Sequence, residues 1–142
     1  MTPLVTVLQT LEAKITAAPD LGVTIADDLA GIRSATRQHA SVLVFRESTS
    51  GLNETRNQDV QRVEDRIRVD LSWRVKPKDQ RTSRDAAVAK SADLRSRLTD
   101  LDDTTMRKWG VVCVSERERR AGEWLTIEHT FRVRRIRTVG AG

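Results

Sequence analysis

Residue types that often carry out chemistry are sparse in this chain of 142 residues. His39 and His129 are the only histidines, and Cys113 is the only cysteine. Neither histidine has a Cys, His or carboxylate at a spacing typical of zinc sites. His129 is in line with Ile127 and Phe131 on the apolar side of a predicted strand, so we interpret it as a core histidine hydrogen-bonded to a neighbour. We interpret Cys113 as a small buried hydrophobe, because a single cysteine can form no internal disulfide.

Other catalytic patterns do not emerge from the sequence. It has no Gly-x-Ser-x-Gly elbow, and its seven glycines form no phosphate-binding loop. Small nucleases bind magnesium through a few acids, and the candidates of that type are Asp27-Asp28, Glu64-Asp65, Asp70 and Asp102-Asp103. We expect Asp70 to pair instead with an arginine on a neighbouring strand, such as Arg132 or Arg134. The sequence therefore predicts no catalytic residue, no metal site and no cofactor, and a protein that is not an enzyme.

The chain is basic, with 25 Lys and Arg against 20 Asp and Glu. This excess permits binding to nucleic acid or to an acidic protein surface. The arginines that could form a basic sheet face are Arg66, Arg68, Arg74, Arg132, Arg134, Arg135 and Arg137. Proteins that bind single strands interleave such charges with stacking aromatics. The chain has no Tyr, and we assign Phe45, Trp73 and Phe131 to the core. A small basic nucleic-acid-binding protein is therefore an alternative interpretation.

Two stretches with strict alternation must position these charges. From Val63 to Val75 the odd positions are apolar, with Asp65 as the only exception, and the even positions are polar. The stretch 125–134 repeats the pattern, so each stretch predicts a long strand with one apolar and one charged face. Both strands are expected to share one sheet. Its charged sheet face would comprise Arg66, Arg68, Asp70, Arg74, Glu128, Arg132 and Arg134.

Shorter signals predict the remaining elements. Thr2 and Pro3 are typical of a helix cap and first helical residue, and a buried stripe follows at Leu4, Leu8, Leu11 and Ile15. Residues 42–45 predict a strand. A second helix is expected from a cap formed by Thr82 and Asp85 to about Leu101. Asp102 and Asp103 would then lie at its C-terminal end, where negative charge is unfavourable for the helix dipole. Residues 111–114 begin another strand, and Ala121-Gly122 is the expected hairpin turn.

Together these elements predict one α+β domain over residues 1–142. Its mainly antiparallel sheet of about four strands packs against two helices, in the order α-β-β-α-β-β. A polar connection at 46–61 is either a long loop or the tip of an extended hairpin, and residues 138–142 are a frayed tail. Residues 23–40 stay open between a short strand at Val23 and Ile25 and a helical turn. The last hairpin places either Val111 or Val112 opposite Phe131.

The pattern resembles the tail terminator proteins of long-tailed bacteriophages and related neck and tail-completion proteins. The resemblance covers most of residues 1–137, with no match over residues 23–40, and lies in the order of features. These are the opening helix from Thr2, a strand ending in Ser72-Trp73-Arg74-Val75, the polar turn 76–84, the Ala-rich helix 85–101, and a closing hairpin with Glu123-Trp124-Leu125-Thr126-Ile127 before Phe131-Arg132-Val133.

The resemblance implies a homo-oligomer, usually a hexameric ring, at the end of the tail tube. Its partners would be the tail tube protein and the head-completion or connector protein, and DNA would pass through without sequence-specific binding. The protein would be made in the host cytoplasm, would not enter a membrane, and would reside in the virion. Another phage neck or assembly adaptor is an alternative. We expect the assembly interface at Arg46, Asn53, Arg56, Lys78, Arg81, Trp109, Arg119 and Trp124. For Trp109 the core is the alternative position.

Overall fold

Five strands form one mixed sheet and three helices pack against it, in a computed structural model that describes residues 2–17, 23–25, 40–52 and 60–138. The strands lie in the order β1-β2-β3-β5-β4. Along the chain the elements are α1 (Leu4–Thr16), β1 (Val23–Ile25), β2 (Ala40–Gly51), β3 (Val60–Arg74), α3 (Gln80–Leu98), α4 (Thr104–Lys108), β4 (Val112–Ala121) and β5 (Trp124–Thr138). The expected α+β class is confirmed. The sheet has one strand and the protein one helix more than expected, and one strand pairing is parallel.

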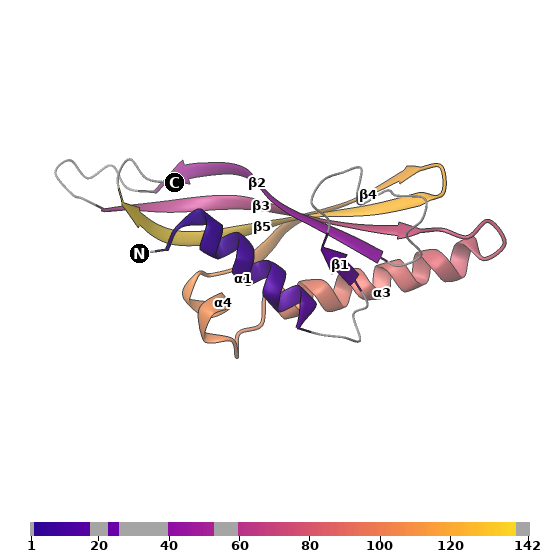
Figure 1. Cartoon of the computed structure of the whole chain (residues 1–142), viewed down its shortest axis with the longest axis horizontal. Coiled ribbons are helices and arrows are strands. Elements are labelled where there is room, and N and C mark those ends of the chain that lie inside the picture. The colour runs from indigo at the N-terminus through magenta and orange to yellow at the C-terminus, as the bar shows by residue number, and fades with distance from the viewer. Residues whose placement is uncertain (1, 18–22, 26–39, 53–59, 139–142) are drawn as a thin grey trace.

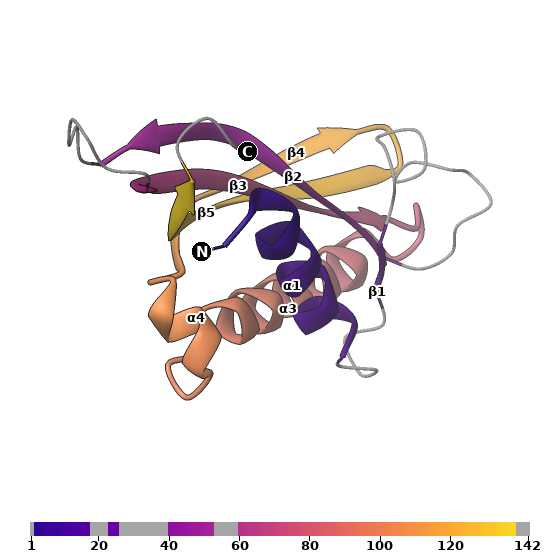
Figure 2. The same ribbon diagram turned by 60° about the vertical axis from the view of Figure 1, so that its left-hand side comes forward.

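The two alternating stretches do share the sheet. β3 and β5 pair antiparallel along their whole length, from Val60 opposite Thr138 to Arg74 opposite Trp124. Figure 1 shows α1, α3 and α4 on the same side of this sheet, and the turned view in Figure 2 agrees. The core lies between the layers. It includes Ile67, Val69 and Leu71 of β3, Phe131 and Val133 of β5, Val7, Leu11 and Ile15 of α1, and Leu94 and Leu98 of α3.

The N-terminal cap differs from the expectation. Pro3, rather than Thr2, occupies the cap position of α1, and no side chain caps the helix. The backbone N–H of Thr2 instead donates to the carbonyl of Ile136, with a nitrogen–oxygen distance of 2.9 Å. The first residues of the chain are therefore bound to the end of β5. Leu11 and Ile15 are buried as predicted, whereas Leu4 and Leu8 are partly buried at the margin of the core.

The second helix starts and ends earlier than predicted. α3 begins at Gln80, with Asp79 at the cap position, so Thr82 and Asp85 lie within the helix. It ends at Leu98, and Leu101 is 74% exposed rather than buried. The acids that follow begin another helix, because the carboxylate of Asp103 accepts hydrogen bonds from the first backbone N–H groups of α4. An acid at that end is favourable for the helix dipole.

The described ends of the polar connection are strand. β2 continues to Gly51 and β3 begins at Val60, so the extended-hairpin alternative holds for these parts, and residues 53–59 lie outside the described residues. Polar residues suit this end of β2 because it pairs with the part of β3 that contains Asp65, with Thr49 directly opposite. Residues 23–25 form the short strand β1, parallel to β2, while 26–39 fall outside the description. The same is true of 139–142, although β5 reaches Thr138.

The closing hairpin turns one residue later than expected. Ala121 pairs with Trp124, which leaves Gly122 and Glu123 as the turn. Gly122 has a φ angle of 58°, a conformation that a residue without Cβ adopts without strain. A shift in the pairing between Cys113 and Ser115 further changes the register. As a result Cys113, and neither valine before it, lies opposite Phe131.

Candidate functional site: the charged sheet face

The charged sheet face lies on the side of the sheet that carries none of the described helices. Side chains on a strand alternate, and the odd-numbered residues of β3 and β5 face the core. All seven residues assigned to the charged sheet face have even numbers and therefore lie together on the other side. Direct neighbours across the strands include Arg66 with Arg132 and Asp70 with Glu128.

The centre of this face is an electrically balanced cluster. Arg68 donates from Nε and Nη2 to the two oxygens of Asp70, at 3.1 and 3.0 Å, and also to Glu128. Arg119 of β4 lies 2.9 Å from Glu128, measured from Nε to Oε1. Burial raises the pKa of the Asp70 carboxyl above its usual value, and Arg68 opposes this rise. Two arginines thus neutralise two carboxylates across three strands.

The partner predicted for Asp70 was wrong. Arg132 and Arg134 lie farther along β5 and approach Glu64 instead. Asp70 itself faces Glu128, so its cation comes from its own strand. Phe45, which we expected in the core, is half-buried on β2 and lies directly opposite Arg68 of β3. The carbon centre of the guanidinium is 5.2 Å from the ring centroid, and this cation–π contact helps to orient Arg68.

One end of the face carries surplus positive charge. Arg66, Arg132 and Arg134 all approach the single carboxylate of Glu64, with nitrogen–oxygen distances of 3.2, 3.8 and 3.4 Å. Three arginines and one acid leave a formal charge of +2, from three minus one. At the opposite end, Arg74 forms a single exposed pair with Glu123. The face is therefore balanced over most of its length and basic at the Glu64 end.

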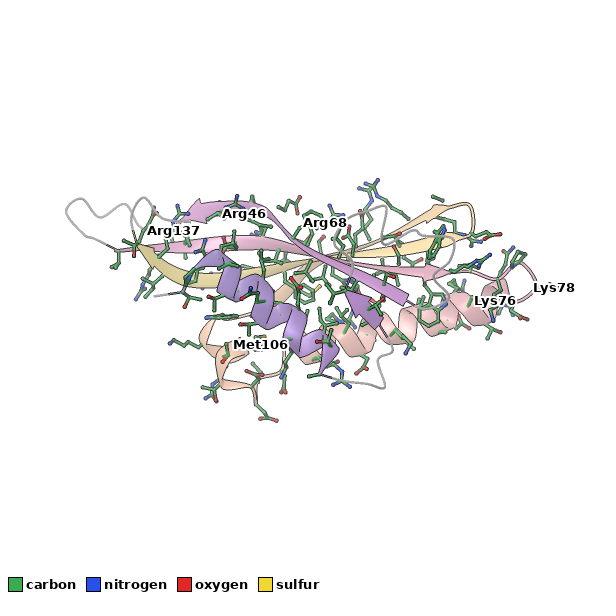
Figure 3. All side chains as sticks on the ribbon, in the orientation of Figure 1. Arg46, Arg68, Lys76, Lys78, Met106 and Arg137 are labelled. Atoms are coloured by element: carbon green, nitrogen blue, oxygen red, sulfur yellow. The ribbon has the colours of Figure 1, made fainter. Side chains whose placement is uncertain are left out.

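The residues expected at an assembly interface are dispersed. Arg46 and Arg119 are exposed on β2 and β4, Lys78 is exposed before α3, and Arg81 is exposed in its first turn. Figure 3 labels Arg46 and Lys78 toward opposite ends of the molecule. Asn53 and Arg56 lie outside the described residues.

The two tryptophans in that set behave differently. Trp109 is 6% exposed and belongs to the core, so the core alternative holds for it. Trp109 directly follows the short helix α4. Its backbone carbonyl accepts a hydrogen bond from the N–H of Arg134, and this bond holds the residue beside β5. Trp124 is half-buried at the end of β5, opposite Arg74 on the charged face.

A buried ion pair was missed by the sequence reasoning. The side chains of Asp65 and Arg135 are both fully buried, and Nε of the arginine is 2.5 Å from Oδ2 of the aspartate. Thr49 donates to the other carboxylate oxygen at 2.5 Å, and Arg135 also donates to the carbonyl of Thr2 at 3.2 Å. The pair therefore connects β2, β3 and β5 with the residues before α1. The sequence does contain a sign of this pair. Asp65 interrupts the apolar series of β3, and Arg135 occupies an odd-numbered position that continues the apolar series of β5.

His129 is a hydrogen-bonded core histidine, as predicted. Its side chain is fully buried, with Nδ1 2.9 Å from the carbonyl of Val69 and Nε2 2.6 Å from Oγ of Ser91. A carbonyl only accepts, so Nδ1 carries the hydrogen in the neutral ring. Glu116 approaches Nε2 at 3.4 Å and pairs with Arg95 of α3. Burial lowers the pKa of His129, while Val69 and Glu116 oppose that shift.

The serine–histidine contact does not form a catalytic site. A serine beside a histidine can act as a nucleophile. Ser91, however, is 3% exposed and lies in the middle of α3, where backbone N–H groups are used within the helix rather than directed at an oxyanion. We assign the contact a structural role. Cys113 is half-buried at the margin of the core, and burial raises its pKa.

The chain matches no protein-family model, and the curated proteins include no match to it. Within the described ranges, no group of three His, Cys, Asp or Glu side chains could hold a metal ion. No helix among the described residues is both long enough and apolar enough to cross a membrane.

Proposed function

We propose that this chain is a structural virion protein that resembles a phage tail terminator and acts by self-assembly. Its copies would form a closed ring, a hexamer as in the proteins that it resembles, on the end of the tail tube. The ring would stop tube polymerisation and offer a joining surface to the head-completion protein, with DNA passing through it. Because this mechanism is geometric, it requires no catalytic residue, metal or cofactor.

The balanced centre of the charged sheet face is the observation that carries the proposal. Arg68, Arg119, Asp70 and Glu128 hold one another in place, so both signs of charge are presented in a fixed pattern. Polyanions favour a uniformly basic surface, whereas such a mixed pattern suits a protein surface of complementary pattern. The side chain of Arg119 is 54% exposed, so the cluster reaches solvent through this arginine, while Asp70 and Glu128 are largely buried. Ring closure would then follow when the rotation between neighbouring copies is correct.

Replacing Trp124 by alanine tests this proposal. Trp124 is half-buried on the charged face beside the exposed Arg74–Glu123 pair, and aromatic residues at such positions often anchor protein contacts. We expect the variant to fold but to assemble more weakly, as measured by native mass spectrometry over a concentration series. Val5→Ala is the matched control, because Val5 is 57% exposed on α1, on the other side of the sheet. Unchanged assembly of the Trp124 variant would count against this face as the interface.

A second candidate function is binding of nucleic acid at the Glu64 end of the face. The specific observation in its favour is the three arginines that share Glu64. Binding to phosphates would weaken with salt, and Arg134→Gln should reduce the slope of log K against log[salt] by about 1. Lys78→Gln, at a distant exposed site, should leave that slope unchanged. A wild-type protein that does not retard DNA at low salt would exclude this candidate.

A further inference from the structure

A groove lies between the end of β3 and the first turns of α3. Its volume is about 700 Å³, and its lining residues are Trp73, Arg74, Lys76, Pro77, Asp79, Thr82, Ser83 and Ala86. The half-buried ring of Trp73 and the small apolar surfaces of Pro77 and Ala86 offer space for an apolar side chain. A concave site with an aromatic wall is the usual setting for one anchoring residue of a partner.

The surroundings of this groove are basic. Lys76 belongs to its lining, and Nζ of Lys90 is 5.8 Å from the ring centroid of Trp73, while the Arg74 side chain pairs with Glu123 on the charged sheet face. Lys78 is exposed in the turn that follows. Asp79 is the one acid among the lining residues, and the Arg74–Glu123 pair is exposed to solvent. The groove therefore favours an apolar side chain that has acidic neighbours.

The same chain displays such a side chain. Leu101 is 74% exposed, more than any other large hydrophobic residue in the described part of the chain, and lies between Asp100 and Asp102. Oδ1 of Asp100 accepts a hydrogen bond from the N–H of Asp102 at 3.0 Å, which holds the turn that presents the leucine. Lys14 pairs closely with Asp103, which also caps α4, and its Nζ lies 3.9 Å from Oδ2 of Asp100. We call residues 100–102 the acidic knob.

Groove and acidic knob lie at opposite ends of α3. The helix has 19 residues, a length of about 28 Å at a rise of ~1.5 Å per residue. Lys76 beside the groove and Met106 in α4, beyond the knob, are labelled far apart in Figure 3. A single copy therefore cannot insert its own knob into its own groove. A contact between two different surface patches is heterologous, and heterologous contacts generate rings or open filaments.

We propose that Leu101 of one copy inserts into the Trp73 groove of the next copy, with Asp100 and Asp102 facing Lys76. This inference rests on the proposed function, because it names the subunit contact of that same assembly. The occupant is a second copy of this chain, since the chain carries both an apolar groove with a basic rim and an apolar knob with acidic flanks. The contact is head-to-tail, as ring closure requires.

Mixed disulfide formation tests the contact directly. In a Cys113→Ser background, one preparation carries Leu101→Cys and the other carries Ala86→Cys. After mixing and oxidation, we expect a disulfide-linked heterodimer on a non-reducing gel. The control pair combines Ala86→Cys with Val5→Cys, because Val5 is also exposed and apolar but lies on α1. Equal yields from the two pairs, or no linked product from the first, would overturn the inference.

Association constants provide a second test. Burying a leucine is worth roughly 1.5–3 kcal/mol, so Leu101→Ser should weaken association roughly tenfold to hundredfold in sedimentation experiments. Val5→Ser should change it less than twofold. Lys76→Glu should also weaken association. Mixing the Lys76→Glu protein with an Asp102→Lys protein should restore one contact, in which the new glutamate faces the new lysine. This charge reversal keeps the test valid if a leucine variant misfolds. Rings that form normally with Leu101→Ser would overturn this contact and leave the proposed function intact. Rings that are lost with Trp124→Ala but not with Leu101→Ser would place the interface on the charged face alone.

Discussion

Replacing Asp65 by alanine should destabilise the fold strongly, because it removes the carboxylate that pairs with the buried guanidinium of Arg135. Both side chains are fully buried, and their closest oxygen–nitrogen distance is 2.5 Å. In the variant the guanidinium would retain its bond to the carbonyl of Thr2 but would lose both bonds to the carboxylate. Thr49 would lose the acceptor of its hydroxyl as well.

The expected loss follows from this geometry. Removing one partner of a buried ion pair costs about 3–5 kcal/mol, since an uncompensated charge remains. A loss of that size is a large part of the ~5–15 kcal/mol that stabilises a typical domain. With a urea m-value of ~2 kcal/mol/M, the unfolding midpoint should fall by roughly 2 M. The double variant Asp65→Leu/Arg135→Met removes both charges, so it should be much less destabilised than either single variant.

Urea unfolding followed by tryptophan fluorescence measures these differences. Arg84 and Asp85 form an exposed pair with a distance of 3.1 Å and provide the matched control. Asp85→Ala should change the free energy of unfolding by no more than about 1 kcal/mol, as is typical of exposed pairs. If Asp65→Ala proved as mild as this control, or if the double variant lost the sum of the two single losses, the reasoning about the buried pair would be refuted.

Three further predictions concern single side chains. Burial lowers the pKa of His129, so the unfolded state binds more protons than the folded state below about pH 6.5. In urea titrations, wild type should therefore lose stability relative to His129→Gln as the pH falls from 7.5 to 5.5. Parallel curves of unfolding free energy against pH for the two proteins would contradict this. Arg68→Met should lower the free energy of unfolding by about 1–3 kcal/mol at pH 7, because it removes the cation that Asp70 and Glu128 share. The loss should shrink at acid pH, because the raised pKa of Asp70 allows its protonation. A pH-independent loss, or an equal loss for the more exposed Arg119→Met, would count against the cluster. Gly122→Val should lower the free energy of unfolding by roughly 1–2 kcal/mol, because the φ angle of 58° at Gly122 strains any residue with a side chain. Ala121→Val is the comparison in thermal unfolding. Equal melting temperatures of the two variants would refute the strain.

The long strands could be predicted because their signal is local. In β3 and β5, alternation of side chains directly records which face is buried, and the structure places both strands side by side. The full length of β2 could not be predicted, since its polar second half is specified by pairing with β3 rather than by burial. The helix α4 was missed because five residues are too few to show a period, and its cap, Asp103, was interpreted as the end of α3.

The site was predictable in composition but not in partnership. Alternation placed seven charged residues on one face, but it could not determine the register, and the register decides that Asp70 faces Glu128 rather than an arginine. The buried Asp65–Arg135 pair shows the same limit, because two interruptions in separate apolar series gain meaning only when the strands are aligned. Trp109 illustrates a different limit, since the sequence left it open between core and interface, and an unrecognised helix precedes its position in the core.

The mass and shape of the purified protein test the central claim of self-assembly most directly. Native mass spectrometry and electron-microscope imaging would be carried out at low and moderate salt, with and without isolated tail tubes as a template. We predict closed rings of identical subunits, free in solution or on tube ends. A protein that stays monomeric in both conditions, and that leaves tube ends bare, would contradict it.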